Sequence, residues 1–139
     1  MRGKRILTGS MLMMVAFLFG AATAAFGQAE KTASQTYMEY HAALQKAKKI
    51  DDILPFVTAA RRKEAEKMPA DMKEGMVGMI QELGIQPGFK IVKEEKTAAG
   101  ATLLIEGFDK TKTKATVTVN MVREGGAWKI EKEDQKSGK

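Results

Sequence analysis

The sequence has 139 residues, no cysteine and a formal net charge of +6. Without cysteine the chain can form no disulfide, and it cannot be a lipoprotein that is anchored through a lipid-modified cysteine. The surplus of basic residues is modest, which argues against a nucleic-acid-binding protein, because such proteins usually have a clustered basic face.

The N-terminal residues have the layout of a secretory signal peptide. Three basic side chains lie within the first five residues, residues 11–19 are entirely apolar, and small residues follow. Small side chains at Gly27 and Ala29 favour cleavage after Ala29, and a cut after Ala24 is the second candidate. The alternative is an uncleaved anchor over residues 6–26, although a membrane span needs about 20 mostly apolar residues and this stretch contains several polar ones.

Both alternatives predict an exported domain, periplasmic or extracellular, that meets the membrane only if the first segment is retained. All 17 acidic residues follow Ala29 but three of the 23 basic residues precede it, so the mature chain would carry a charge of about +3. The predicted organisation is a signal peptide over residues 1–29, a single domain over residues 30–134 and a flexible polar tail over residues 135–139.

The first half of the domain has the periodicity of helices. Apolar side chains recur at spacings of three and four, which predicts three helices over about residues 37–47, 51–67 and 71–83. We expect Asp51 or Asp52 to cap the second helix and Asp71 to cap the third. Gly84 is expected to end the third helix in a left-handed conformation.

After Gly88 the period changes to two. The alternation predicts four strands, which include residues 89–91, 101–106, 115–121 and 128–131. Turn-forming residues separate these strands, so the connections are short and the neighbouring strands are expected to be antiparallel. Helices followed by a four-stranded meander predict an α+β domain whose helices pack on one face of the sheet.

Three stretches of the chain resemble the nuclear transport factor 2-like superfamily, also called the cystatin-like α+β roll, and in particular its small exported members of unknown function. Residues 40–44 followed by Asp51 and Asp52 resemble the family's opening helices, residues 115–123 its central strand, and residues 124–130 its closing hairpin. The resemblance covers about residues 32–134. It implies a curved sheet around helices with a conical pocket, but no single activity, because members include isomerases, dehydratases and plain binding modules.

The resemblance also implies a ligand-binding role for three aromatic residues, Tyr37, Tyr40 and Trp128. Aromatic side chains with a polar group suit the mouth of an apolar pocket, and they suit an ordinary core equally well. An isomerase- or dehydratase-like enzyme would need a carboxylate with a raised pKa in the pocket, and Glu106 is the candidate.

No catalytic residue is assigned from the sequence. The chain has one histidine, His41, and it has neither a cysteine nor a Gly-x-Ser-x-Gly turn that would supply a nucleophile. We interpret His41 as a structural side chain beside the apolar stripe of the first helix. The motifs of phosphate-binding loops and metalloproteases are absent as well.

Four methionines recur at spacings of four, four and three: Met68, Met72, Met76 and Met79. Thioethers outside the cytoplasm can bind copper(I), and the same spacing is typical of flexible core side chains on an amphipathic helix. Zinc is not expected from one histidine and adjacent carboxylate pairs, and no cofactor is predicted.

The sequence also contains a cluster of basic residues between the second and third predicted strands. Lys110, Lys112 and Lys114 are interpreted as a solvated hairpin end, with contact to anionic headgroups as the alternative.

The leading hypothesis is a non-enzymatic exported module that binds a small apolar ligand or assembles with an envelope protein. The alternatives are an enzyme of the same superfamily, a copper(I)-binding protein, and a homodimer formed through the sheet.

Overall fold

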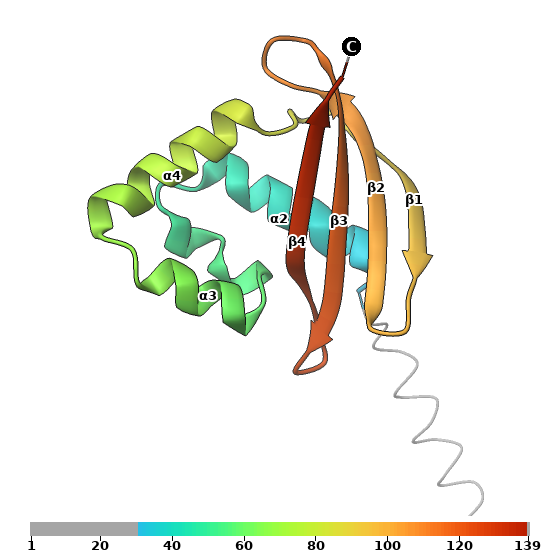
Figure 1. The fold of residues 1–139 in the computed structure, drawn as a ribbon, viewed down its shortest axis with the longest axis horizontal. Coiled ribbons are helices and arrows are strands. Elements are labelled where there is room, and N and C mark those ends of the chain that lie inside the picture. The colour runs from blue at the N-terminus through green and yellow to red at the C-terminus, as the bar shows by residue number, and fades with distance from the viewer. Residues whose placement is uncertain (1–30, 139) are drawn as a thin grey trace, which may run out of the picture. The chain divides into compact units, whose positions relative to one another are not determined.

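A computed structural model describes residues 31–138 of the chain. The predicted signal peptide, its cleavage after Ala29 and the anchor alternative all lie outside these residues. The described part contains three α-helices and two 3₁₀ turns followed by four strands (Figure 1): α2 (Ala33–Lys46), η1 (Ile50–Asp52), η2 (Leu54–Phe56), α3 (Ala59–Glu66), α4 (Ala70–Leu83), β1 (Lys90–Lys96), β2 (Gly100–Phe108), β3 (Lys114–Glu124) and β4 (Ala127–Ser137). No helix between residues 31 and 138 is long and apolar enough to cross a membrane.

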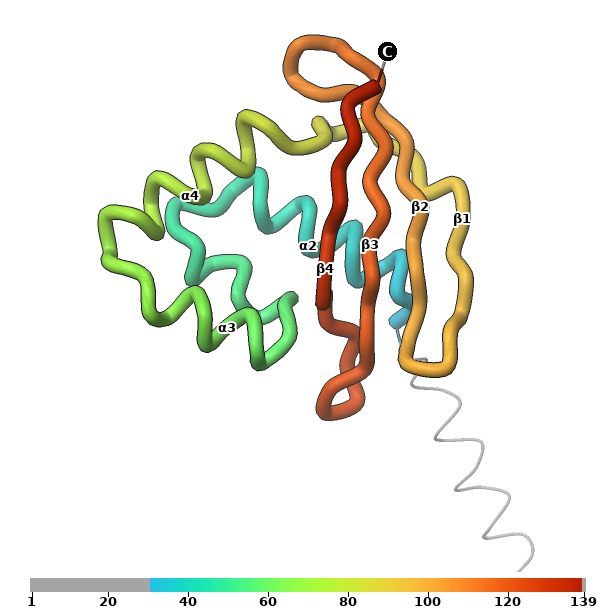
Figure 2. The backbone as a smooth tube through the Cα atoms, viewed as in Figure 1, coloured from blue at the N-terminus to red at the C-terminus, as the bar shows by residue number. Residues whose placement is uncertain are grey.

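The four strands form one antiparallel sheet in the order β1-β2-β3-β4. Each strand lies beside its sequence neighbour, as the backbone trace shows (Figure 2). Helix α2 crosses one face of this sheet, and α3 and α4 lie beside it on the β4 side (Figure 1). The predicted α+β class and the antiparallel meander are therefore confirmed.

The core lies between the helices and the inner face of the sheet. Because side chains alternate along a strand, the odd-numbered residues of the two central strands share the inner face, and the following are buried: Ala101, Leu103, Ile105, Ala115, Val117, Val119 and Met121. The outer face carries mainly threonines and charged residues that are partly or fully exposed.

A bulge in β4 reverses this alternation. Ile130 lies opposite Met121 and Lys132 lies opposite Asn120, so that Glu131 is an extra residue without a partner of its own. The bulge therefore brings Glu133 opposite Val119, on the inner face of the sheet. The first residues of the predicted tail continue the strand, because Gln135 and Ser137 pair with β3. The prediction of a flexible tail is thus wrong for residues 135–137.

A second bulge, in β1, has a similar effect. Val92 is the extra residue there, and Glu94 consequently lies opposite the inward-facing Leu103. One carboxylate oxygen of Glu94 accepts hydrogen bonds from the backbone N–H of Ser34 at 2.8 Å and from its hydroxyl at 2.7 Å. The N–H groups in the first turn of a helix have no partner within the helix, so this carboxylate ties the start of α2 to the sheet.

The predicted second helix is interrupted. Val57 is extended and bridges to Ile130 of β4, and the N–H of Thr58 donates to the Ile130 carbonyl at 3.1 Å. Thr58 then caps α3, which makes α3 a separate short helix. Asp52 does not start a long helix, because its carboxylate accepts from the N–H groups of Lys48 and Lys49.

The ends of α4 also differ from the prediction. Pro69 occupies the N-cap position, so Asp71 lies within the first turn and does not cap the helix. Gly84 is extended, with φ −76° and ψ 168°, and is not left-handed. A Cβ atom at this position would lie 2.6 Å from the Ile80 carbonyl oxygen, so this close approach, and not a left-handed backbone, requires glycine.

Two neighbouring leucines test the assignment of the sheet faces. Leu103 is fully buried whereas Leu104 lies on the outer face, so Leu103→Ala should lower the free energy of unfolding by about 2–5 kcal/mol. Leu104→Ala should cost at most about 1 kcal/mol. Urea unfolding of both variants provides the measurement, and equal losses would contradict the assignment.

Candidate functional site

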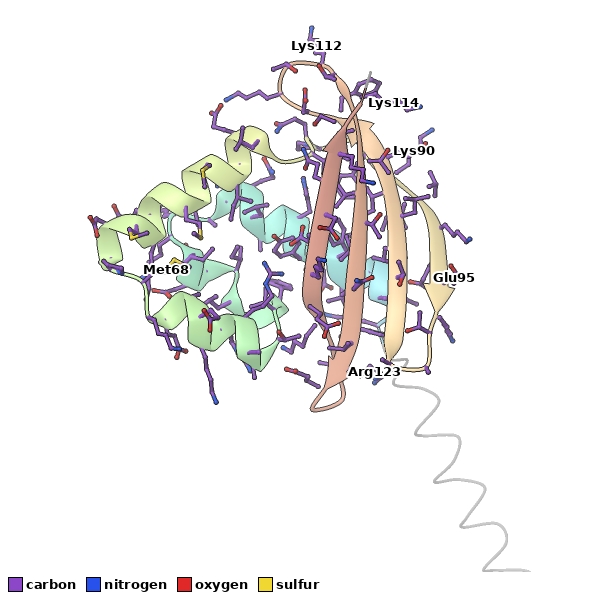
Figure 3. All side chains as sticks on the ribbon, viewed as in Figure 1. Met68, Lys90, Glu95, Lys112, Lys114 and Arg123 are labelled. Atoms are coloured by element: carbon purple, nitrogen blue, oxygen red, sulfur yellow. The ribbon has the colours of Figure 1, made fainter. Side chains whose placement is uncertain are left out.

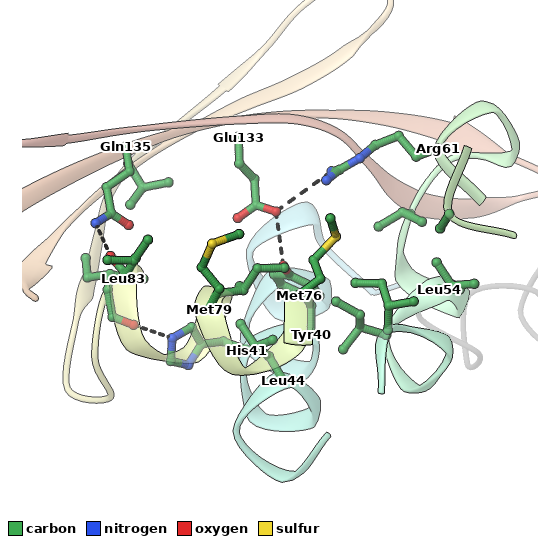
Figure 4. A pocket seen from close by; sticks show the side chains of 18 of the residues that line it. Tyr40, His41, Leu44, Leu54, Arg61, Met76, Met79, Leu83, Glu133 and Gln135 are labelled. Atoms are coloured by element: carbon green, nitrogen blue, oxygen red, sulfur yellow. Dashed lines mark hydrogen bonds and ion pairs between the residues drawn. The ribbon is translucent and has the colours of Figure 1, made fainter. Parts of the chain in front are cut away.

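A pocket of about 640 Å³ lies between the helices and the inner face of β3 and β4 (Figure 4). This volume is within the range of small-molecule sites, about 300–1,000 Å³. Most of its lining is apolar and comes from the helices, the two 3₁₀ turns and the residues next to them: Leu44, Ile50, Ile53, Leu54, Val57, Ala65, Met68, Met76, Met79, Ile80, Leu83 and Ile85.

One polar group of three side chains faces this apolar lining. Glu133 reaches in from β4, Tyr40 from α2 and Arg61 from α3 (Figure 4). The Tyr40 hydroxyl donates to Oε1 of Glu133 at 3.1 Å, and Nη1 of Arg61 lies 3.8 Å from the same oxygen. Oε2 of Glu133 has no hydrogen-bond partner among residues 31–138. The carboxylate is thus only partly satisfied by the protein.

Burial controls the ionisation of this group. Only 24% of the Glu133 side chain is exposed, and desolvation raises its pKa even though Arg61 and the Tyr40 hydrogen bond act in the opposite direction. Burial also raises the pKa of Tyr37 and of Tyr40, and the nearby Glu133 adds to both shifts. Both tyrosines are therefore neutral at physiological pH, and Tyr40 acts as a hydrogen-bond donor.

His41 lines the pocket, but its ring contacts the backbone of Ile85 and not the polar group around Glu133. Its Nε2 lies 2.8 Å from the carbonyl oxygen of Ile85, and because a carbonyl can only accept, we assign the proton to Nε2. Burial lowers the pKa of His41, and its ring packs edge-on against Phe89 with centroids 4.6 Å apart. These contacts agree with the interpretation of His41 as a structural residue.

The structure brings together only part of the predicted ligand-binding set. Tyr37 and Tyr40 line the pocket, whereas Glu106 and Trp128 do not. Glu106 is exposed on the outer face, because it follows the inward-facing Ile105, so its predicted position in the pocket is wrong. Trp128 lies at the far end of β4, where its ring centroid is 5.4 Å from the guanidinium carbon of Arg123.

Sequence reasoning missed Glu133 and Arg61. Residues 131–136 are all polar, so the sequence contains no alternation that would show which of them faces inward. Arg61 lies in a charged stretch that looks solvent-exposed from sequence alone. Only the bulge at Glu131, which is not visible in the sequence pattern, turns Glu133 toward the helices.

The methionine stripe is divided between the pocket and the surface. Met68, Met76 and Met79 line the pocket, and Met72 does not. Met72 and Met79 are more than half exposed, at 54% and 52%, so the prediction of four buried core methionines is wrong for these two. Copper(I) binding by the stripe stays a prediction. Within residues 31–138 no group of three histidine or carboxylate side chains is placed to hold a metal ion.

The basic cluster lies around the β2–β3 connection, at one end of the sheet (Figure 3). Lys110 forms an ion pair with Glu82 of α4, and Lys112 has a left-handed backbone with φ 65°. The Asp109 carboxylate accepts hydrogen bonds from the N–H groups of Thr111 and Thr113 and so orders the turn. The cluster is separate from the pocket lining.

The described residues thus define an α+β protein with a mainly apolar, ligand-sized pocket that contains a partly satisfied carboxylate. Comparisons with protein-family models, curated proteins and solved structures find no significant match. The chemistry of the pocket is therefore the basis for the functional proposal.

The raised pKa of Glu133 predicts how stability depends on pH. The folded state holds the proton more tightly than the unfolded state, so the associated stability is present below the ordinary pKa of 4.5 and is lost as pH rises through the folded-state pKa. Glu133→Gln cannot ionise and can still accept from Tyr40. The variant should therefore melt at a higher temperature than the wild type at about pH 7.5, and this advantage should disappear near pH 4. A lower melting temperature at about pH 7.5 would contradict the assignment.

Proposed function

We propose that this protein binds a small, largely apolar molecule in the pocket between the helices and β4. The observation that supports the proposal best is the pocket itself, a cavity of about 640 Å³ with a mainly aliphatic and methionine lining and a cluster of polar side chains around Glu133. Ligand sites typically combine an apolar wall with a few polar groups that fix orientation.

The rim of the pocket supports the same proposal. Met79 and Leu83 line the pocket although both are more than half exposed. Flexible methionine side chains adapt to ligands of different shapes, and exposed apolar side chains at a pocket mouth gain stability when a ligand covers them. The pocket is thus accessible from the surface along α4.

Two methionines on α4 provide a matched test of ligand binding. Met79 lines the pocket and Met72 does not, although their exposure is nearly equal. Met79→Ala should weaken binding of the neutral apolar dye Nile red by about fivefold, because losing about 1 kcal/mol of apolar contact corresponds to that change. Met72→Ala should leave the affinity unchanged in the same fluorescence titration. Equal effects of the two substitutions, or no saturable binding, would count against the proposed pocket function.

A second candidate function is supported by the position of Glu133. A carboxylate with a raised pKa in an apolar pocket, hydrogen-bonded to a tyrosine, is a suitable general base or acid. This candidate corresponds to the isomerase- or dehydratase-like alternative, with Glu133 in the role first considered for Glu106.

A model reaction tests this second candidate without knowledge of the substrate. If Glu133 is a catalytic base, the protein should accelerate the base-promoted ring opening of a nitrobenzisoxazole. Glu133→Gln should abolish the acceleration, and Glu106→Gln, which removes a charge on the outer face, should not. The rate of absorbance increase is the measurement. A rate equal to that of buffer would leave ligand binding as the better proposal.

Family, location and assembly belong to the same proposal. The order of helices before an antiparallel meander, with the helices on one face, supports membership of the nuclear transport factor 2-like superfamily. The layout of the first residues supports export to the periplasm or beyond. Assembly with an envelope protein or a second copy would use the outer sheet face, which the helices leave open, and a dimer mass in native mass spectrometry would support it.

A further inference from the structure

The electrostatics of the pocket indicate the class of ligand, on the basis that the proposed binding function is correct. Arg61, Glu64 and Glu133 line the pocket. The Glu64 side chain is 78% exposed and lies 3.9 Å from the Lys67 ammonium, whereas only 24% of the Glu133 side chain is exposed. Glu133 is therefore the acidic side chain inside the pocket, and no lysine belongs to the lining.

Glu133 is the group that a ligand would contact. Met76 and Met79 flank its carboxylate in the close view, and Tyr40 lies below it (Figure 4). Oε1 is used by Tyr40 and lies near Arg61, whereas Oε2 has no hydrogen-bond partner among the described residues. The carboxylate therefore has one oxygen available to a hydrogen-bond donor on a ligand.

The end of α4 adds negative potential to the same pocket. Leu83 and Gly84, at the C-terminal end of this helix, belong to the lining. The carbonyl groups at a helix C-terminus carry a partial negative charge, and the last turn of α4 contains no basic residue. The carbonyls of Leu83 and Gly84 accept hydrogen bonds from the side-chain amides of Gln135 and Gln86, so the helix end adds only a small contribution to that of Glu133.

The alternatives fit less well. An anionic ligand would need Arg61, whose guanidinium already lies 3.8 Å from Glu133, and the negative charges of the ligand and of Glu133 would then share a partly dehydrated site. A neutral ligand would exclude water from the carboxylate without compensating its charge. A cationic donor would replace that water with a charge-assisted hydrogen bond.

We propose that the pocket selects amphipathic amines, molecules with an apolar body and a positively charged nitrogen that donates to Oε2 of Glu133. The apolar body lies against the methionine and aliphatic lining from α4 and the 3₁₀ turns. Tyr40 holds the carboxylate in place through its hydroxyl, which donates to Oε1 of Glu133.

Three probes with the same alkyl chain test this inference. Octylamine, octanol and octanoate are titrated into the full domain at neutral pH by isothermal calorimetry. Octylamine should bind about tenfold more tightly than octanol, the change expected for one charge-assisted hydrogen bond, and octanoate should bind most weakly. Equal affinities, tighter binding of octanoate, or no binding of octylamine would overturn the inference.

Two charge-removing variants assign the preference to the pocket. Glu133→Gln should abolish the preference for octylamine over octanol, whereas Glu106→Gln should retain it, because Glu106 lies on the outer face. Circular dichroism of both variants verifies folding. A preference that survives in Glu133→Gln would overturn the inference. If octanol and Nile red bind without any preference for the amine, the proposed pocket function stands and only the ligand class is wrong.

Discussion

The position of Ile130 is the constraint on which the rest of the structure depends. Its side chain is fully buried opposite Met121, and its backbone carbonyl accepts a hydrogen bond from Thr58. The segment before α3 is therefore attached to β4 at the residue where the bulge begins. Without the extra residue Glu131, regular alternation would bring Lys132 and Asp134 to the inner face and turn Glu133 to solvent. One backbone irregularity thus positions α3 and also supplies the carboxylate of the pocket.

The helices share a hydrophobic core, and polar contacts also connect them around the pocket. The Gln81 side-chain amide of α4 donates to the carbonyls of Leu44 at 2.7 Å and Ala47 at 3.0 Å, where α2 ends. Lys73 of α4 lies 3.4 Å from the Asp51 carboxylate of η1. These contacts satisfy backbone groups at a helix terminus and fix α4 beside α2, so the pocket persists between α4 and β4 without side chains that fill it.

Regular periodicity determined what could be predicted from the sequence. Residues 115–121 of β3 alternate strictly, and β2 pairs with β3 without a bulge, so the faces of these strands and their pairing were predictable. The break in the predicted second helix was not predictable, because the bridge from Val57 to Ile130 is a tertiary contact that overrides the local helical preference. Tyr37 and Tyr40 lie on the regular apolar stripe of the first predicted helix, and their place in the pocket was predicted. Glu133 lies beyond a bulge in a wholly polar segment, where the pattern contains no information about the direction of a side chain.

The same carboxylate would link the stability of the fold to the proposed binding. An ionised Glu133 has lost part of its hydration and receives incomplete compensation from Tyr40 and Arg61, which is why its pKa is raised. That unfavourable free energy belongs to the unliganded protein. A bound cation would remove it, because the new interaction stabilises the charged form that burial disfavours. A glutamine at this position would keep the Tyr40 contact and avoid the desolvation, but it would give a cation nothing to neutralise. The feature that weakens the empty protein is therefore the one that would give the pocket the selectivity we propose.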